Sequence, residues 1–582
     1  MEINLIKIQE EEKISADYNI INLHGLSKDE EEIINPLVPP TSGLRMEIFD
    51  KTESQFNMSL NKLEHFLRVI KAVAAIGKKE LKKEQPNVLI VADDRYSATT
   101  LIDYASRIFN YEQYTIYHQS REGEVVQGTS YKRGLSRMSS PYASASSALY
   151  DNIDLVLMIT ASHNSFVWNG LKFYIERPIP ISGGVMQDVS KLAISLSQIK
   201  LSKSYNPIYI DADARNNKYI RKIVSNIINT DVLKAKKVIM WPFLGVAPEL
   251  KNLLESYGAE VIIIDESRNP PDPTHGFDEK KVTDLMDENK VKIAILLDAD
   301  RDRLVFITKT KKGYKKLTSN ELYTAMMNIL SKELDKKFVN VRTIPSDPRC
   351  DNGALVNFIT GVGYKHLGLI QFMAANRKLP QSQLDTAILY HKDKNNYTKI
   401  SSVDDVNVVF NKLNYTGDLI FVLWEESGGH TFNILEAEEE NNRIVLKSKY
   451  PLIGDKYPAP AIIVLCSLLE MGYDLIDYLD ETIKGTRTTI TATDEIKLKY
   501  MSYFSQKIDE SIEIKGKKYH IGAFSNNSDK TAIIYFKSED SMLYIRPSGT
   551  GPKIRIYIFG NYKTYKQELE NVAKFVRNLE LA

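Results

Sequence analysis

The chain has 582 residues, long enough for three to five domains of roughly 150 residues each. Its 76 lysines and arginines nearly balance 75 aspartates and glutamates, which excludes a general nucleic-acid binder and an acidic disordered chain. Two cysteines exclude a disulfide framework and a cysteine-based zinc site, and the longest apolar stretch, 458–469, is too short to span a bilayer. The acidic start is unlike a signal peptide, so we expect a cytoplasmic protein with neither a nucleic-acid nor a membrane partner.

Short apolar runs alternate with longer helical segments along most of the chain. In chain order, the clearest predicted strands are 88–91, 155–159, 238–240, 261–264, 293–297 and 419–423, and the clearest helices are 60–75, 247–257 and 320–334. Strands that are apolar throughout suit mixed or parallel α/β sheets covered on both faces. The end of the chain differs, with strands predicted at 532–536, 542–545 and 554–558 before a helix at 562–579. This order predicts a smaller α+β domain at the C-terminus.

Four polar segments each follow a predicted strand, where open α/β sheets place their ligands. The first is Thr160-Ala-Ser-His-Asn164, with Lys172 a few residues further on. Ser162 beside His163 and Asn164 suits a nucleophile whose surroundings are ordered by polar groups. The same residues also suit a polar turn, and the G-x-S-x-G pattern of α/β-hydrolases is absent.

The second segment is Asp298-Ala-Asp300-Arg-Asp302-Arg303. Three carboxylates at alternate positions need a compensating cation, and oxygen donors favour Mg²⁺ or Ca²⁺. An EF-hand loop is excluded because Arg303 occupies its glycine position. A solvated acidic turn paired with its own arginines is the alternative.

The third segment is Glu425-Glu-Ser-Gly-Gly-His430, where carboxylate and hydroxyl groups suit the recognition of neighbouring sugar hydroxyls. A loop that simply follows a strand, with no binding role, accounts for this segment equally well.

The fourth segment is Arg546-Pro-Ser-Gly-Thr-Gly-Pro-Lys553. The Arg546 guanidinium, the hydroxyls of Ser548 and Thr550, and the backbone N–H groups around Gly549 can bind an anion. It lacks the Walker A pattern, so ATP is not the expected ligand. A structural Pro/Gly turn is the alternative.

Together and in this order, these segments resemble the α-D-phosphohexomutase superfamily, which includes phosphoglucomutases and phosphomannomutases. Thr41-Ser-Gly-Leu-Arg45 resembles the N-terminal signature of that family, and Thr160–Asn164 with Asn169-Gly-Leu-Lys172 resembles its phosphoserine loop. The aspartate segment resembles its metal loop, Thr360-Gly-Val-Gly-Tyr-Lys365 its V-G-x-K element, 425–429 its sugar loop, and 546–550 its phosphate loop. Six matches in the right order are highly specific.

The resemblance implies an α/β fold of four domains around a central cleft, three with a mixed α/β core and a smaller α+β fourth. We expect an N-terminal extension at 1–35, domain I with the phosphoserine loop at 36–205, domain II with the metal loop at 206–312, domain III with the sugar loop at 313–475, and domain IV with the phosphate loop at 476–582.

The resemblance also implies an intramolecular phosphotransferase that moves phosphate between O1 and O6 of a hexose through a sugar 1,6-bisphosphate. Ser162 would carry the phosphate, and one Mg²⁺ would lie between it and Asp298, Asp300 and Asp302. Glucose phosphate is the expected substrate, mannose phosphate the second, and glucose 1,6-bisphosphate the activator. The residues expected to assist catalysis are Arg45, His163, Lys172 and Arg303. Those expected to bind substrate are Lys365, Glu425, Ser427, His430, Arg546, Ser548, Gly549 and Thr550.

Several positions depart from the family pattern. Ser165 stands where proline is usual, which predicts a less rigid loop. Arg301 stands at a spacer that is often glycine, so it would be strained if that position needs a positive φ. Gly551 replaces a common glutamate, and the approach to Thr41 lacks a glycine.

Other functions remain compatible with the sequence. Within the superfamily, the chain can be a phosphoglucosamine or phosphopentose mutase. Outside it, the altered loops fit a catalytically weak sugar-phosphate-binding relative, although Ser162 and the three aspartates are retained. A phosphatase is a further alternative, since water can intercept a phosphoserine. The sequence indicates no oligomeric state.

Overall fold

The structure is a computed structural model that describes residues 2–34, 44–52, 54–120, 136–181, 183–274, 276–394, 396–548 and 552–579. The chain divides into two compact units. Unit 1 consists of Met1–Ser319, Ile420–Glu436 and Lys447–Asp474. Unit 2 consists of Asn320–Leu419, Ala437–Leu446 and Leu475–Ala582.

The first large sheet of unit 1 has six strands in the order β12-β8-β7-β9-β10-β4. Its inner strands pair in parallel, whereas β10 pairs antiparallel with both β9 and β4, so the sheet is mixed. The strands are β4 (Leu44–Glu47), β7 (Asn87–Ala92), β8 (Thr115–Gln119), β9 (Leu155–Ile159), β10 (Trp168–Ile175) and β12 (Ile208–Ile210). The strands predicted at 88–91 and 155–159 are therefore confirmed, and they lie at its centre.

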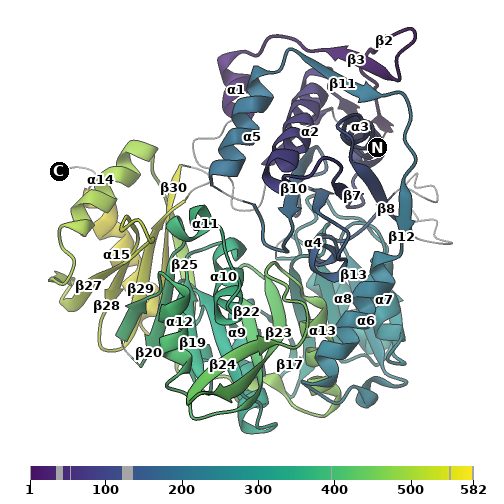
Figure 1. Ribbon diagram of the computed structural model, residues 1–582. Coiled ribbons are helices and arrows are strands. Elements are labelled where there is room, and N and C mark those ends of the chain that lie inside the picture. Colours follow the sequence, from purple (N-terminus) through teal and green to yellow (C-terminus); the bar gives the residue numbers. More distant parts are fainter. Residues whose placement is uncertain are drawn as a thin grey trace. The chain divides into compact units, whose positions relative to one another are not determined.

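Helices cover both faces of this sheet. The apolar faces of α2 (Leu60–Leu81), α3 (Ala98–Tyr111) and α5 (Gly184–Ser195) share one core with alternate residues of the strands, such as Val88 and Ile90 (Figure 1). Leu89 and Val91 point to the opposite face and are also fully buried. That face carries α4 (Ser140–Leu149), which packs against β7 and β9 and against α6 (Ala212–Ser225). Burial on both faces explains why these strands are continuously apolar.

The segment before residue 35 is folded onto this domain. Two three-stranded sheets, β1-β6-β5 and β11-β3-β2, tie it to later strands. Their strands are β1 (Glu2–Asn4), β2 (Glu11–Glu12), β3 (Tyr18–Asn22), β5 (Phe49–Lys51), β6 (Gln55–Met58) and β11 (Gln198–Ser202). A short helix, α1 (Lys28–Ile34), follows β3, and Ile34 is buried in the shared core.

The second large sheet of unit 1 has the order β14-β13-β15-β16-β17. Its strands are β13 (Lys237–Pro242), β14 (Glu260–Ile263), β15 (Ile293–Leu297), β16 (Leu304–Thr310) and β17 (Gly313–Leu317). The accompanying helices are η1 (Asp231–Leu233), α7 (Pro248–Glu255), α8 (Glu279–Glu288) and α13 (Ala459–Glu470). The apolar run at 458–469 forms the buried helix α13, and among the described residues we find no helix with the length and apolar character needed to cross a membrane.

Unit 2 begins with α9 (Ser319–Lys332), of which Ser319 is still the last residue of the first segment of unit 1. Four strands follow α9 and pair in the order β21-β20-β19-β18. These are β18 (Phe338–Thr343), β19 (Val356–Thr360), β20 (Leu389–Asp393) and β21 (Asn396–Lys399), with η2 (Pro348–Asp351), α10 (Tyr364–Ala374), α11 (Gln381–Asp385) and α12 (Val403–Phe410) between or after them. Three further strands are divided between the two units: β22 (Gly417–Trp424), β23 (His430–Glu440) and β24 (Arg443–Ser448).

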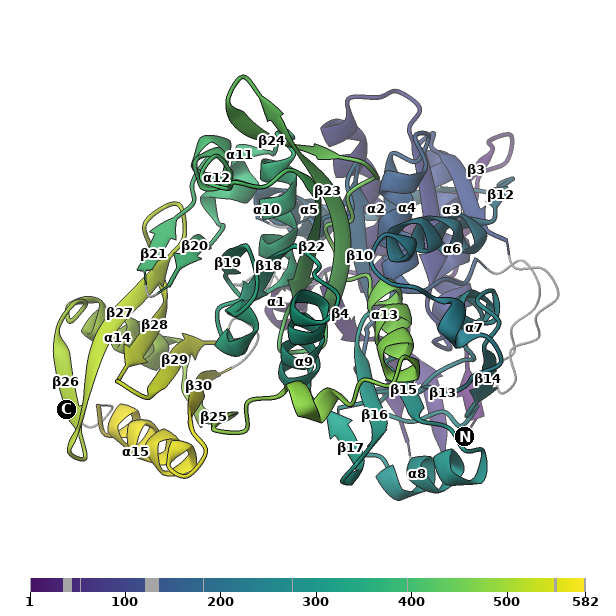
Figure 2. The same ribbon diagram turned by 90° about the horizontal axis from the view of Figure 1, so that it is seen from below.

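The C-terminal part of unit 2 is an antiparallel six-stranded sheet in the order β25-β30-β29-β28-β27-β26. Its strands are β25 (Ile483–Thr491), β26 (Ser511–Ile514), β27 (Lys517–Ser525), β28 (Thr531–Lys537), β29 (Ser541–Pro547) and β30 (Lys553–Asn561), preceded by η3 (Leu475–Tyr478). Both α14 (Asp494–Ser505) and α15 (Tyr565–Asn578) pack into the core on one face, in the yellow region of Figure 2. The opposite face packs on residues of β19 and β20. The predicted run of strands followed by a terminal helix is confirmed, and the antiparallel sheet with helices on one face is an α+β arrangement within unit 2.

Candidate active site

The loop after β9 holds Ser162 in an uncommon backbone conformation. Ser162 has φ +53° and is completely buried. Its backbone N–H donates to Thr160 Oγ1 at 2.9 Å, and that hydroxyl donates to Asp93 Oδ2 at 2.7 Å. A left-handed conformation at a non-glycine residue is costly and tends to occur at functional sites. The loop is therefore held in one defined shape.

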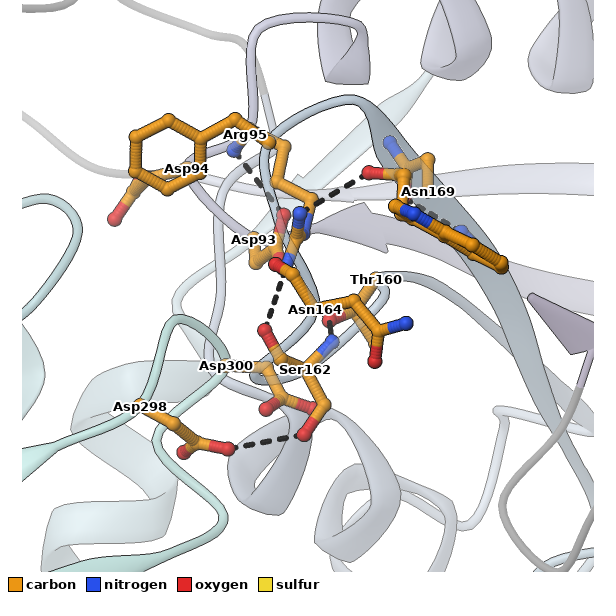
Figure 3. Close-up of polar contacts among 12 residues, drawn as sticks. Asp93, Asp94, Arg95, Thr160, Ser162, Asn164, Asn169, Asp298 and Asp300 are labelled. Carbon is orange, nitrogen blue, oxygen red and sulfur yellow. Dashed lines mark hydrogen bonds and ion pairs between the residues drawn. The ribbon is translucent and has the colours of Figure 1, made fainter. Parts of the chain in front are cut away.

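Arg95, from the turn after β7, holds the same loop through backbone carbonyls. Its guanidinium donates to the carbonyl oxygens of Ser162, Asn164, Ser165 and Trp168, the last three at 2.8, 2.8 and 3.0 Å. Arg95 Nε also donates to Asp93 at 3.2 Å (Figure 3). The planar guanidinium suits such a set of acceptors, because its five N–H donors lie in a fixed arrangement.

The Ser162 hydroxyl contacts the aspartate segment. Ser162 Oγ donates to Asp298 Oδ2 at 2.9 Å, as Figure 3 shows, and His163 Nδ1 lies 3.4 Å from the same oxygen. Burial, with Arg303 and Arg45 nearby, lowers the pKa of His163 to about 3, so its ring is neutral at physiological pH. The serine oxygen is thus next to a carboxylate and a neutral imidazole.

Asp298, Asp300 and Asp302 converge after β15. Each offers one carboxylate oxygen within 4.8 Å of the others, and all three are buried. Burial raises the pKa of Asp298 well above its ordinary value, and the two neighbouring carboxylates raise it further. The Oδ1 atoms of Asp300 and Asp302 are buried without a hydrogen-bond partner among the described residues. Buried oxygen donors arranged in this way fit a hard divalent cation such as Mg²⁺.

Lys172 and Arg303 supply positive charge to this cluster. Lys172 Nζ, on β10, lies 2.8 Å from Asp300 Oδ2 and 3.0 Å from Asp302 Oδ2. Burial by itself lowers the pKa of Lys172, but the two carboxylates outweigh it and raise the pKa above its ordinary value. The backbone N–H of Arg303 donates to Asp298 Oδ1 at 3.1 Å. Lys172 is therefore a cation in this structure.

Arg301 has the positive φ that the sequence analysis considered for this position, +60°. Its buried guanidinium pairs with Asp94 and lies 3.3 Å from Glu249 Oε1, at the start of α7. Gly245 has φ +77° and a side chain there would collide with Asp94, because a Cβ would lie 2.0 Å from Asp94 Oδ2. At this position of the metal loop, where the family often has glycine, Arg301 instead forms buried ion pairs with Asp94 and Glu249.

The third polar segment is joined to the aspartates by a residue that the sequence analysis did not select. Lys456 Nζ lies 3.2 Å from Glu425 Oε1 and 3.6 Å from Asp302 Oδ2. Ser427 Oγ donates to the same Glu425 oxygen at 2.7 Å. His430 is completely buried at the start of β23, and burial lowers its pKa to about 3. Glu425 and Ser427 are thus close to the metal loop.

Arg45, on β4, reaches the serine loop from another strand. Arg45 Nη1 donates to Asn164 Oδ1 at 3.1 Å. Burial lowers the pKa of Arg45, and Arg303 nearby lowers it further. The preceding residues of the expected signature, 41–43, lie outside the described residues.

In unit 2, two of the residues expected to bind phosphate, Lys365 and Arg546, both act on the buried His366. Burial lowers the pKa of His366 well below its ordinary value, and the charges of Lys365 and Arg546 lower it further. The Ser548 carbonyl accepts a hydrogen bond from Lys497 Nζ at 3.0 Å. Gly549, Thr550 and Gly551 lie outside the described residues. Lys365 near the start of α10 and Arg546 near the end of β29 therefore lie close enough to His366 to affect its charge.

Comparisons with known proteins show which sequences the chain resembles. Residues 38–200 match the family model described as phosphoglucomutase/phosphomannomutase, alpha/beta/alpha domain I. The phosphoglucomutase of Staphylococcus saprophyticus is 23% identical over 462 residues, which cover 73% of this chain and 75% of that protein. The phosphoglucosamine mutase of Thermodesulfovibrio yellowstonii is 24% identical over 442 residues, covering 73% and 79%.

Solved structures share the fold over nearly the whole chain. The pp63/parafusin phosphoglucomutase of Paramecium has a TM-score of 0.60 at 15% identity, covering 97% of this chain and 96% of its own. A phosphoglucomutase/phosphomannomutase family protein of Burkholderia thailandensis has a TM-score of 0.60 at 14% identity, covering 94% and 98%. The chain belongs to the α-D-phosphohexomutase superfamily. It is an isomerase that acts as an intramolecular phosphotransferase, and its predicted fold class is confirmed.

Within this phosphohexomutase, unit 1 brings together most of the residues selected from the sequence. Ser162, the three aspartates, Lys172, Arg303 and Glu425 are linked by direct contacts or share neighbours. Asp93, Arg95 and Lys456 were missed. Each of the first two follows β7, and a polar run after a predicted apolar strand was the available signal. Lys456 follows no predicted strand, so only the fold reveals it.

Proposed function

We propose that the chain interconverts hexose 1-phosphate and hexose 6-phosphate in the cytoplasm, with glucose as its principal sugar and mannose as a second one. Phosphate would be carried on Ser162, and a sugar 1,6-bisphosphate would be both intermediate and activator. The observation that carries the proposal is the hydrogen bond from Ser162 Oγ to Asp298, inside a cluster of three buried carboxylates paired with Lys172. The two cysteines are buried free thiols, which suits a reducing compartment.

Asp298, Asp300 and Asp302 would hold one Mg²⁺. When bound, the ion would neutralise charge on the transferring phosphoryl group. The fit rests on the buried Oδ1 atoms of Asp300 and Asp302, which have no hydrogen-bond partner among the described residues. Lys172 keeps the local charge balanced, since it pairs with both of these carboxylates.

The transfer itself requires little chemistry beyond alignment. The bond between Ser162 Oγ and phosphorus breaks as a sugar hydroxyl oxygen bonds to the same phosphorus. The proton that the sugar hydroxyl loses ends on the released Ser162 Oγ, so the products are a serine hydroxyl and a sugar phosphate. Arg95 would fix the backbone of Ser162, so that Oγ stays in line with the acceptor. Arg303, Arg45 and the neutral His163 would stabilise charge on the phosphoryl oxygens or hold the reacting hydroxyl.

The rest of the substrate would be held by groups that do not react. Glu425 and Ser427 offer an acceptor and a donor for neighbouring sugar hydroxyls. His430 is completely buried and would support the loop that carries them. Lys365, Arg546 and Ser548, with Gly549 and Thr550, would bind the phosphate remote from Ser162. Binding energy at a remote phosphate makes either orientation of the bisphosphate productive.

A coupled assay with glucose 1-phosphate, with and without glucose 1,6-bisphosphate, tests this proposal. Ser162→Ala should lose most turnover with the fold intact, and peptide mapping of the wild type should find phosphate on Ser162. Ser165→Ala is the matched control and should keep its activity, because Ser165 contributes a backbone carbonyl to the loop. Activity near wild type in Ser162→Ala, with phosphate mapped elsewhere, would refute the assignment.

Glucosamine phosphate is the second candidate substrate. It is favoured by the relatives named phosphoglucosamine mutase, which match this chain at similar identity. Parallel kcat/KM measurements on glucose, mannose and glucosamine 1-phosphates decide between them. A glucosamine value well above the other two would replace glucose in the proposal.

A further inference from the structure

A second cluster of metal-binding side chains lies far along the chain from the serine loop. It is formed by His24, which follows β3, Glu30 in α1, and His65 in α2. Each offers one ligand atom, and the three atoms all lie within 4.8 Å of one another. None of these residues belongs to the proposed transfer site.

Two of the separations have the dimensions of a zinc site. Glu30 Oε1 lies 3.2 Å from His24 Nε2 and 3.4 Å from His65 Nε2. Ligands at about 2.0–2.1 Å from a tetrahedral Zn²⁺ lie about 3.3–3.4 Å apart, so one ion fits between these atoms. The other carboxylate oxygen, Oε2, accepts hydrogen bonds from the backbone and side chain of Ser27, both at 2.8 Å, which leaves Oε1 directed at the two rings.

His65 provides a second, independent observation. Its side chain is 5% exposed, and its Nε2 atom has no hydrogen-bond partner among the described residues. The ring is buried, and burial lowers the pKa of His65 below its ordinary value. A buried ring nitrogen without a hydrogen bond carries a desolvation cost, which coordination of a metal would offset.

His24 has the outer partner that metal-bound histidines usually have. Its Nδ1 lies 2.5 Å from Glu64 Oε2, which also accepts from the His24 backbone N–H at 3.2 Å. Glu64 therefore holds Nδ1 in the protonated form, which leaves Nε2, 3.2 Å from Glu30 Oε1, as the nitrogen that would ligate. The His24 carbonyl accepts from the buried Arg68, so the backbone of this residue is held as well.

We propose that His24, Glu30 and His65 bind one Zn²⁺, with Glu64 as the outer-shell carboxylate. Two imidazoles and one carboxylate are a donor set that zinc accepts, and His24 and Glu30 are both partly exposed, which leaves the fourth position to water. The ion would pin α1 to α2 and so fasten the N-terminal segment to domain I.

Zinc titration of the full-length protein tests the proposal. After treatment with a chelator, the protein is titrated with Zn²⁺ in excess Mg²⁺, and Co²⁺ is used as a spectroscopic probe. We expect one Zn²⁺ per chain, a rise in Tm, and the intense visible absorption of tetrahedral Co²⁺. His24→Gln and His65→Gln should each abolish these signals, and Glu64→Gln should weaken binding about 10–100-fold.

Two controls separate this site from the transfer site. Asp300→Asn should leave the Co²⁺ spectrum unchanged, and the exposed His520→Gln should do the same. His24→Gln should keep mutase turnover in Mg²⁺. If His65→Gln does not fold, the partly exposed His24→Gln decides. Absence of zinc binding in excess Mg²⁺, or binding unaltered in His24→Gln, would overturn the proposal without touching the proposed function.

Discussion

Ser162 Oγ donates a hydrogen bond to Asp298 Oδ2 at 2.9 Å, although the two residues are 136 positions apart in the chain. The serine comes from the loop after β9 and the aspartate from the loop after β15, in two different sheets of unit 1. This contact places the Ser162 hydroxyl next to the cluster of Asp298, Asp300 and Asp302, whose negative charges repel one another. Such a cluster is stable only with cations nearby, which Lys172 supplies in part.

The first prediction concerns the cation held by the three aspartates. Chelation should abolish turnover and Mg²⁺ should restore it. Asp300→Asn should raise the Mg²⁺ concentration for half-maximal activity more than about tenfold, since even outer-shell partners contribute about 10–100-fold in metal affinity. Mg²⁺ titration of the initial rate measures this. Full turnover in exhaustively chelated buffer would contradict the prediction.

The second prediction concerns Arg95, which holds the serine loop without contacting Ser162 Oγ. Arg95→Lys keeps the charge but cannot reproduce hydrogen bonds to four carbonyls. A displacement of about 1 Å can cost roughly a hundredfold in rate, so kcat should fall while KM changes little. Arg215→Lys, at an exposed arginine, is the control. If glucose 1,6-bisphosphate phosphorylated Ser162 in Arg95→Lys at the wild-type rate, Arg95 would have no positioning role.

The third prediction weighs strain against ion pairing at Arg301. Arg301→Gly relieves a left-handed conformation that costs about 1–2 kcal/mol. It also removes the buried partner of Asp94 and Glu249, and breaking a buried pair costs about 3–5 kcal/mol. Because the loss of the buried ion pairs outweighs the relief of backbone strain, Arg301→Gly should be less stable than the wild type. Urea unfolding measures the difference, and a glycine variant of equal or higher stability would show that the ion pairs contribute little.

The fourth prediction concerns stability at acid pH. Burial lowers the pKa of His118 to about 4, and its Nε2 atom lies 2.9 Å from Ser106 Oγ. In the unfolded chain its pKa is about 6.5, so the unfolded state binds the extra proton between these values and stability falls as pH falls from 6.5 toward 4. At pH 5 the loss from this group is about 2 kcal/mol.

His118→Asn removes this titration. The difference in unfolding free energy between pH 7 and pH 5 should shrink by about 2 kcal/mol in the variant, whatever its stability at pH 7. His520→Asn, at an exposed histidine, should retain the wild-type difference. An unaltered pH dependence in His118→Asn would show that the buried ring is not the group that titrates.

Strands and helices with strong local patterns were predictable from the sequence. The strand at 155–159 and that at 293–297 have the predicted bounds, because an apolar run ends there against polar residues. The helix predicted at 60–75 continues to Leu81, since the buried Gly77 and Leu81 extend its apolar face. Ends of elements depend on packing that a local pattern does not contain.

The site was predictable where chemistry is concentrated in short motifs. Ser162 and the three aspartates were recognisable because unusual residues follow apolar strands. Arg95 and Lys456 were not, because their partners are backbone carbonyls or side chains brought near only by folding. The positive φ at Arg301 was anticipated from the spacer position, whereas its pairing with Asp94 depends on tertiary structure.

The last prediction separates recognition of the remote phosphate from the transfer. Arg546 lies in β29, in a different sheet from the strand that precedes Ser162, and it contributes donors, with no base to activate a nucleophile. A charge-assisted hydrogen bond of this kind contributes about 1.5–3 kcal/mol, or roughly ten- to hundredfold in binding. Arg546→Ala should therefore raise KM for glucose 1-phosphate by about that factor, with a smaller loss of kcat because a loosely held substrate is poorly aligned.

Two further measurements on Arg546→Ala make the distinction sharp. Phosphorylation of Ser162 by glucose 1,6-bisphosphate should slow but still occur, and discrimination against sugars without the second phosphate should weaken. Arg577→Ala, at an exposed arginine of α15, is the control for loss of a positive charge in the same part of the chain and should leave KM unchanged. If Arg546→Ala left KM unchanged and instead blocked transfer from an already phosphorylated Ser162, Arg546 would belong to the reacting centre, because only a group that stabilises the transition state can slow that step without weakening binding.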